Sequence, residues 1–214
     1  MTKAETISRI SRTGVLPVVR AGSAEDARGA IDAICEGGID TVEITLTIPN
    51  AVALIAQLAR ERPDVLVGAG TVMSAVDAQR CIDAGATFII SPATVPEVIR
   101  VCAENETLVI PGVLTPTEIT TALELGVDVV KVFPVSAVGG ADYIRSLRAP
   151  FPDLKLVPTG GITTHTVGEY ITAGVMAVGL GSDLVDLSAI RDRRASDVTA
   201  AARRVLNTIV EARQ

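Results

Sequence analysis

The chain has 214 residues, of which 48% are hydrophobic and 21% are charged, which is enough apolar material for a sizeable single core. The formal net charge is −6, no run is rich in Lys or Arg, and the aromatic residues are only two Tyr and three Phe. Nucleic acid is therefore not favoured as a partner, because the chain has neither a basic cluster to bind phosphates nor many aromatic side chains on which bases could stack. The N-terminus is polar and no apolar run approaches the roughly 20 residues that cross a bilayer, so we expect no membrane partner and a cytoplasmic location.

Cysteine and histidine usage limits the chemistry further. Cys35, Cys81 and Cys102 each fall within an amphipathic helical pattern and form no CxxC pair, which predicts buried free thiols rather than disulfides. His165 is the single histidine and is interpreted as a solvent-facing residue at the start of a helix. Because metal sites draw on clustered His, often with Cys or carboxylates, we expect no bound metal and no other cofactor.

Short apolar segments recur along the chain at intervals of about 20 to 26 residues, and each is followed by a helical stretch. The eight segments begin at residues 15, 41, 65, 88, 108, 129, 156 and 177. This alternation predicts parallel strands, and their near-continuous apolar composition is typical of strands covered on both faces. Eight units favour an α/β fold of the (β/α)₈ TIM-barrel type. The alternative is an open doubly wound sheet, but VVRAGSAEDA, which follows the first strand, lacks its glycine fingerprint.

Two further helical segments, roughly residues 3–12 and 195–212, lie outside the eight units. No linker rich in Pro, Gly or Ser flanks either of them. We therefore expect one barrel domain spanning residues 1–214, with an extra N-terminal helix and a C-terminal helix packed on the ends or sides of the barrel.

Two helix starts carry a cap-and-carboxylate pattern. Thr115 supplies a cap, Pro116 the first helical position and Glu118 the third. Thr94 and Glu97 repeat the spacing of cap and carboxylate. Both patterns predict helices that begin directly after a strand.

Lys131 lies in the strand VVKVFP. Side chains of a barrel strand alternate between the interior and the helix layer, so Val130 and Val132 facing the helices place Lys131 inside the barrel. It is one of three lysines against sixteen arginines. A desolvated lysine can lose its proton and become a nucleophile or Schiff-base former, whereas an arginine stays protonated. The alternative is a lysine that extends from a strand end or pairs with a carboxylate.

The same alternation in DTVEITLTIP directs Glu43 into the barrel, together with Thr41 and Thr45. A carboxylate beside the buried amine of Lys131 can divide acid and base duties with it. The alternative is a Lys–Glu ion pair that only holds the core together, and the sequence alone does not separate the two.

Glycine-rich segments close the last two strands, PTGG at residues 158–161 and GLGS at residues 179–182. Barrels commonly form a phosphate site at these positions from backbone N–H groups. The alternative is that the glycines only make tight turns. Two such segments at the same end of neighbouring strands favour phosphate binding.

Several polar or rigid residues end other strands. Arg20 ends the first strand, where its planar fork can hold a substrate carboxylate or, alternatively, form a surface salt bridge. Thr71 in GAGT, Pro92 in SPAT and Thr159 in PTGG also lie at strand ends, where they can shape a pocket.

Seven ordered segments between about residues 14 and 187 resemble a known family. They are TVEITLTIPN, GAGTV, ISPAT, IPGVLTPTE, VKVFP, PTGGI and AVGLGS. The resemblance is to the family of 2-keto-3-deoxy-6-phosphogluconate (KDPG) aldolases and 4-hydroxy-2-oxoglutarate (KHG) aldolases. It implies a class I, Schiff-base aldolase on a (β/α)₈ barrel, usually a homotrimer, that cleaves a 2-keto-3-deoxy-6-phospho sugar acid to pyruvate and glyceraldehyde 3-phosphate.

The resemblance also implies roles for single residues. Lys131 matches the Schiff-base lysine and Glu43 the general acid/base. Thr71 and Thr159 match pocket residues near the pyruvyl part, and Pro92 matches a residue that shapes the site. The phosphate cradle is matched by Gly160, Gly161, Gly181 and Ser182.

One position departs from the family. Many members carry an arginine four residues after the glutamate, where this chain has Thr47, and similar members without it carry an arginine at the end of the first strand. Arg20 is therefore the expected substitute. The substrate could also be 4-hydroxy-2-oxoglutarate or the galactonate epimer of KDPG. An epimerase of sugar phosphates, which would predict a metal and more histidines, is not supported, and a non-catalytic phosphate-binding barrel is the remote alternative from another class.

Overall fold

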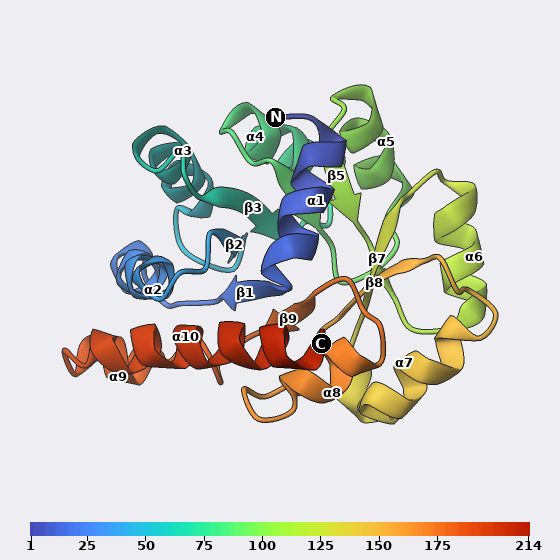
Figure 1. Cartoon of the computed structure of the whole chain (residues 1–214). Coiled ribbons are helices and arrows are strands. Elements are labelled where there is room, and N and C mark those ends of the chain that lie inside the picture. Colours follow the sequence, from blue (N-terminus) through green and yellow to red (C-terminus); the bar gives the residue numbers. More distant parts are fainter.

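The computed structural model describes all residues 1–214, and its parallel strands form a barrel that helices surround (Figure 1). Hydrogen bonding orders the strands β5-β4-β3-β2-β1-β9 in one sheet and β6-β7-β8 in another. A parallel bridge from Thr159 to Gly179 joins β8 to β9 and closes the ring. The strands are β1 (Val15–Val19), β2 (Thr41–Thr45), β3 (Leu66–Gly70), β4 (Phe88–Ile90), β5 (Leu108–Ile110), β6 (Gly112–Val113), β7 (Val129–Val132), β8 (Lys155–Pro158) and β9 (Val178–Leu180).

The predicted TIM barrel is confirmed, with its fifth strand divided into β5 and β6. Pro111 lies between the two parts and has no N–H to contribute to the ladder, although its carbonyl accepts a hydrogen bond from Lys131 N–H at 2.8 Å. Counted as one strand, β5 and β6 complete a ring of eight.

Helices follow each strand and cover the outside of the barrel (Figure 1). The expected N-terminal helix and the long C-terminal helix are both present, and the latter packs against α2 and α8. The helices are α1 (Lys3–Thr13), α2 (Ala24–Glu36), α3 (Ala51–Glu61), α4 (Ala75–Asp83), α5 (Pro96–Glu104), α6 (Pro116–Glu124), the 3₁₀ helix η1 (Val135–Val138), α7 (Gly140–Arg148), α8 (Val167–Thr172), α9 (Leu187–Arg191) and α10 (Ala195–Ala212).

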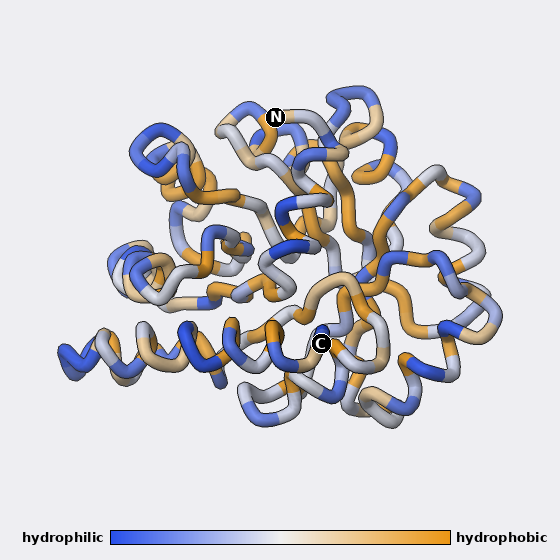
Figure 2. The backbone as a smooth tube through the Cα atoms, in the orientation of Figure 1, coloured by the Kyte–Doolittle hydropathy of each residue, from blue (hydrophilic) through white to orange (hydrophobic).

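The strands separate two hydrophobic cores. A cluster of 56 buried residues fills the layer between strands and helices, and one of 11 buried residues fills the barrel interior. Side chains alternate between them: Leu16 belongs to the interior cluster, whereas Val15 and Val19 belong to the outer one. Figure 2 shows the resulting pattern, with apolar strands at the centre and hydrophilic stretches on the surrounding helices.

Helix α1 covers the N-terminal end of the barrel. Thr2 caps it in a capping box with Glu5, and Ile10 is fully buried in the interior cluster. Arg9 Nε donates to Asp40 Oδ2 at 2.8 Å, which ties the helix to the residue before β2. The end opposite α1 is therefore the open end, where the strands finish.

One predicted helix cap is confirmed and the other is wrong. Thr115 forms a capping box with Glu118 at the start of α6. At α5 the N-cap is Val95, without a side-chain hydrogen bond, and Pro96 takes the first helical position. The Thr94 hydroxyl instead donates to the carbonyl of Gly112 in β6 at 3.0 Å. This tertiary hydrogen bond replaces the helix cap that the sequence pattern predicted for Thr94.

The cysteines form no disulfide. Cys81 and Cys102 are buried as expected, whereas Cys35 is half-buried. Burial raises the pKa of the Cys81 thiol to about 11 and that of Cys102 to about 12. No helix in the structure combines the length and the apolar composition needed to cross a bilayer.

Candidate active site

Lys131 and Glu43 meet inside the barrel. Lys131 Nζ lies 3.7 Å from Glu43 Oε1, and the two side chains are 8% and 2% exposed. Both positions obey the alternation expected from the sequence, since Val129 belongs to the interior cluster and Val130, Val132 and Ile44 to the outer one. The structure thus confirms the inward direction of both side chains.

Glycine makes room for the Glu43 carboxyl. Gly70 pairs with Thr45 across the β2–β3 ladder, and a Cβ built on Gly70 would lie 2.0 Å from Glu43 Oε1. Any side chain at position 70 would therefore collide with the Glu43 carboxyl unless one of the two groups shifts. Gly70 is a site residue that the sequence reasoning missed, although its place in GAGT on the neighbouring strand was visible.

The carboxyl is also without a hydrogen bond. Glu43 Oε1 is buried and has no hydrogen-bond partner in the structure. The threonines on either side of it on β2 point their hydroxyls elsewhere: Thr41 donates to Val15 O at 2.8 Å and Thr45 to Val19 O at 2.9 Å. A buried acceptor that lacks a partner is costly, and active sites are where such groups are retained.

A cavity of about 380 Å³ opens at the C-terminal end of the barrel, and the Lys–Glu pair is not among the residues that line it. Phe133 links the two, because its ring lines this cavity and its centroid lies 5.4 Å from Lys131 Nζ. Phe133 was missed, although it has the same strand parity as Lys131. Five residues predicted from the sequence line the cavity: Thr159, Gly160, Gly161, Gly181 and Ser182.

The loop glycines present free backbone donors in this cavity. Gly160 and Gly161 have φ values of +96° and +76°, which L side chains rarely adopt. The N–H groups of Gly160, Gly161, Gly181 and Ser182 donate to no other group of the chain. The carbonyl of Gly160 accepts from Ser136 N–H at 3.1 Å, which holds the loop against η1. The cavity thus has the N–H groups that an anion such as a phosphate requires.

Besides Lys131 and Glu43, three predicted residues lie outside this cavity. Thr71 is half-buried directly after β3, with φ +60°. Pro92 packs its carbonyl against β6, since a Cβ on Gly112 would lie 2.1 Å from it, and Gly112 pairs with Lys131. Arg20 is exposed after β1 and donates to Thr47 Oγ1 at 3.1 Å rather than forming a salt bridge.

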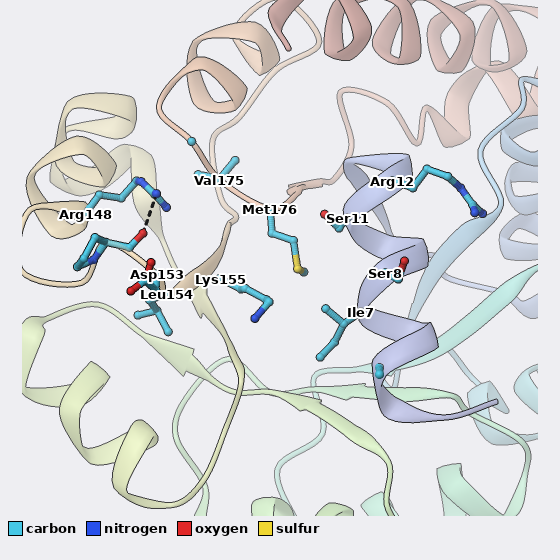
Figure 3. Close-up of a pocket in the computed structure, with 13 residues that line it drawn as sticks. Ile7, Ser8, Ser11, Arg12, Arg148, Asp153, Leu154, Lys155, Val175 and Met176 are labelled. Carbon is cyan, nitrogen blue, oxygen red and sulfur yellow. Dashed lines mark hydrogen bonds between the residues drawn. The ribbon is translucent and has the colours of Figure 1, made fainter. Parts of the chain in front are cut away.

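A larger hollow, of about 720 Å³, lies at the other end of the barrel between α1 and the start of β8 (Figure 3). None of the predicted site residues lines it, and its charged residues are exposed or half-buried, including Lys155. Arg148 in its wall donates to the Pro152 carbonyl at 2.8 Å (Figure 3). The larger hollow is therefore not the candidate active site, because Lys131 and Glu43 lie toward the opposite end of the barrel.

His165 is exposed in the turn before α8, as interpreted from the sequence. No group of three or more His, Cys, Asp or Glu side chains is arranged as metal ligands.

Comparison with known proteins agrees with this geometry. A family model described as KDPG and KHG aldolase matches residues 6–201. The 2-dehydro-3-deoxy-phosphogluconate aldolase of Treponema pallidum is 38% identical over 201 residues, which cover 94% of this chain and 95% of that protein. A probable 2-dehydro-3-deoxy-6-phosphogalactonate aldolase of Rhizobium meliloti is 34% identical, covering 79% of this chain and 81% of that protein.

A solved structure is also similar over nearly the whole chain. It is the KDPG aldolase of Legionella pneumophila with pyruvate captured at low pH as a covalent carbinolamine intermediate. The two chains share 33% identity and a TM-score of 0.87, with 94% of this chain and 97% of that chain covered. The chain therefore belongs to the family of KDPG and KHG aldolases.

Proposed function

We propose that this chain is a class I aldolase that cleaves 2-keto-3-deoxy-6-phosphogluconate to pyruvate and glyceraldehyde 3-phosphate. The observation that carries the proposal is the buried Lys131 amine, which lies 3.7 Å from Glu43 Oε1, an oxygen that accepts no hydrogen bond. The relatives named as KDPG aldolases and the free N–H groups of the neighbouring cavity support the same reaction.

Lys131 acts as the nucleophile. Its neutral Nζ adds to the C2 ketone to give a carbinolamine, and loss of water leaves a protonated imine. The imine accepts the electron pair of the C3–C4 bond when that bond breaks, and an enamine remains on Lys131.

Glu43 acts as the general base and then as the acid. Its carboxylate takes the proton of the C4 hydroxyl, directly or through water, so that C4 leaves as the aldehyde. The protonated carboxyl then delivers a proton to C3 of the enamine, which becomes the pyruvate methyl group. Water hydrolyses the imine, releases pyruvate and restores the amine.

The remaining predicted residues bind the substrate. Gly160, Gly161, Gly181 and Ser182 hold the phosphate through their free N–H groups. Thr71, Thr159 and Pro92 shape the pyruvyl part of the pocket, and Arg20 binds the carboxylate.

Intact mass after incubation with pyruvate and borohydride tests the proposal. We expect one reduced pyruvate per chain, mapped to Lys131, and no adduct and no turnover in Lys131→Ala. Lys3 and Lys155, the other two lysines, are internal controls in exposed or half-buried positions. No adduct on Lys131 would overturn the proposal and favour a non-catalytic phosphate-binding barrel.

The substrate is tested separately. We expect kcat/KM for KDPG to exceed that for 4-hydroxy-2-oxoglutarate, because only the phosphorylated substrate uses the free N–H groups of the cavity. The galactonate epimer of KDPG carries the same phosphate, so comparing kcat/KM for the two epimers measures the preference for the hydroxyl configuration alone. Faster cleavage of 4-hydroxy-2-oxoglutarate would contradict the phosphorylated substrate while leaving the aldolase mechanism intact.

We also propose a homotrimer in the cytoplasm, as the family resemblance implies. Met73 and Val76, which are 51% and 69% exposed near the start of α4, are the kind of apolar side chains that oligomer interfaces cover. Light scattering should give three times the chain mass of 22.2 kDa, and Val76→Glu should lower it. A mass of one chain would contradict the trimer, and cell fractionation tests the location.

A further inference from the structure

We propose that Thr47 is a positioning residue that holds the Arg20 guanidinium at the mouth of the barrel, ready for the substrate carboxylate. The inference rests on the proposed aldolase function, and it assigns a role to the residue at which this chain departs from many members of its family.

Arg20 directly follows β1 and continues its inward-facing side. Leu16 on this strand belongs to the interior cluster, and Val18 lines the cavity at the C-terminal end. Because side chains alternate along a strand, Arg20 follows on the same face as these two residues. Its guanidinium forms no salt bridge, and its one hydrogen bond is from Nη1 to Thr47 Oγ1 at 3.1 Å.

The direction of each hydrogen bond around Thr47, the anchor of Arg20, follows from the fact that a hydroxyl has only one proton to donate. The Thr45 hydroxyl uses its single proton to donate to Val19 O at 2.9 Å. Thr45 Oγ1 and Thr47 Oγ1 are 2.8 Å apart, so Thr47 must be the donor in that pair. The remaining lone pair of Thr47 then faces Arg20, which can only donate.

The chain of hydrogen bonds therefore runs from Arg20 to Thr47, to Thr45 and to the carbonyl of Val19. It begins at Arg20, directly after β1, and ends at Val19, the last residue of β1. On the way it passes through Thr45 of β2, which pairs with β1 in the register Val18 to Glu43. The guanidinium is thus fixed relative to the strand that carries Glu43.

A neutral anchor suits this task. Thr47 occupies one N–H group and leaves the positive charge and the other donors of Arg20 available for a bidentate carboxylate. A carboxylate at position 47 would hold the guanidinium more strongly but would compete with the substrate for it. The ligand is a carboxylate next to the keto group, because Thr47 follows the strand of Glu43 by two residues and Arg20 does not line the cavity with the free glycine N–H groups.

Steady-state kinetics of single and double variants test the inference. Thr47→Val removes the hydroxyl at similar volume, and we expect KM to rise about tenfold with kcat changed less than about twofold, the pattern of lost uniform binding. Thr47→Ser keeps the hydroxyl and should restore KM. Thr47→Asp should also raise KM, because its charge pairs with Arg20. Thr120→Val, at an exposed position of α6, is the matched control and should change neither constant.

The double variant separates positioning from a general structural effect. Arg20→Ala alone should raise KM by about 100-fold, and adding Thr47→Val should have no further effect, because the hydroxyl acts only through the guanidinium. An unchanged KM in both Thr47→Val and Thr47→Asp would overturn the inference, as would a full tenfold effect of Thr47→Val in the Arg20→Ala background. The pyruvate–borohydride adduct on Lys131 is measured for every variant, so that failure of the aldolase proposal itself is recognised by loss of the adduct in the unaltered chain.

Discussion

Lys131 and Glu43 come within 3.7 Å of each other although their strands, β7 and β2, lie opposite one another across the barrel. Three strands separate β2 from β7 in either direction around the ring when β5 and β6 are counted as one. The pair is thus held by closure of the whole barrel rather than by a local turn. A carboxylate and an amine brought together in this way stay close only while the barrel is intact.

Replacing the carboxyl should separate imine formation from bond cleavage. In Glu43→Gln we expect kcat to fall by about 10² to 10⁴, the usual contribution of a general base, while some adduct with pyruvate and borohydride still forms on Lys131. Turnover assays and intact mass on the same preparation check both parts. A variant with normal turnover would remove Glu43 from the mechanism.

A methyl group on the neighbouring strand should displace the same carboxyl. In Gly70→Ala the new Cβ would lie 2.0 Å from Glu43 Oε1, so we expect kcat/KM to fall by about 10² or more and the free energy of unfolding by about 1–3 kcal/mol. Kinetics and urea unfolding measure the two effects. Gly22→Ala is the control, because nothing lies within 4 Å of its Cβ, and it should leave both near their normal values. Equal activity in the two variants would contradict the placement of the carboxyl.

Buried thiols should make the protein less stable at high pH. Burial raises the pKa of Cys81 to about 11 and of Cys102 to about 12, from 9.0 for an unperturbed thiol. The unfolded chain therefore releases these protons first as pH rises. The stabilisation is complete below about pH 9 and is lost progressively as the pH rises through the folded values.

Two measurements check this expectation. The free energy of unfolding in urea should decrease from pH 8 to pH 10, and the thiolate absorbance of the folded protein should appear at higher pH than that of the unfolded chain. Thiolate absorbance at pH 9 that is equal in the folded and unfolded chains would contradict the raised pKa values.

The cap of α6 should contribute to stability. Thr115→Ala removes the side chain that accepts from Glu118 N–H at 3.3 Å, and we expect a loss of about 1 kcal/mol in the free energy of unfolding. Thr120→Ala removes an exposed hydroxyl within the same helix and is the control, since alanine favours the helix interior. The midpoint of chemical denaturation should therefore be lower for Thr115→Ala than for Thr120→Ala. Equal midpoints would argue against the capping box.

The sequence by itself determined the barrel and the direction of its key side chains. Apolar segments separated by helices are sufficient to predict parallel strands, and the period of two along a strand places Lys131 and Glu43 on the inner face. The capping box at Thr115 was also predictable, because all its atoms come from residues three apart. These features depend on local geometry, which neighbouring residues specify.

Only the tertiary structure decided which of these groups meet. The distance between Lys131 and Glu43 depends on ring closure, and the space for the carboxyl depends on Gly70 of another strand. Thr94 has the spacing of a helix cap but donates to Gly112, because a carbonyl from a distant part of the chain lies within reach. Arg20 was predictable as a cation at a strand end, whereas its hydrogen bond to Thr47 was not. A hydroxyl can donate or accept, and the partners that packing places beside Thr47 decide which it does.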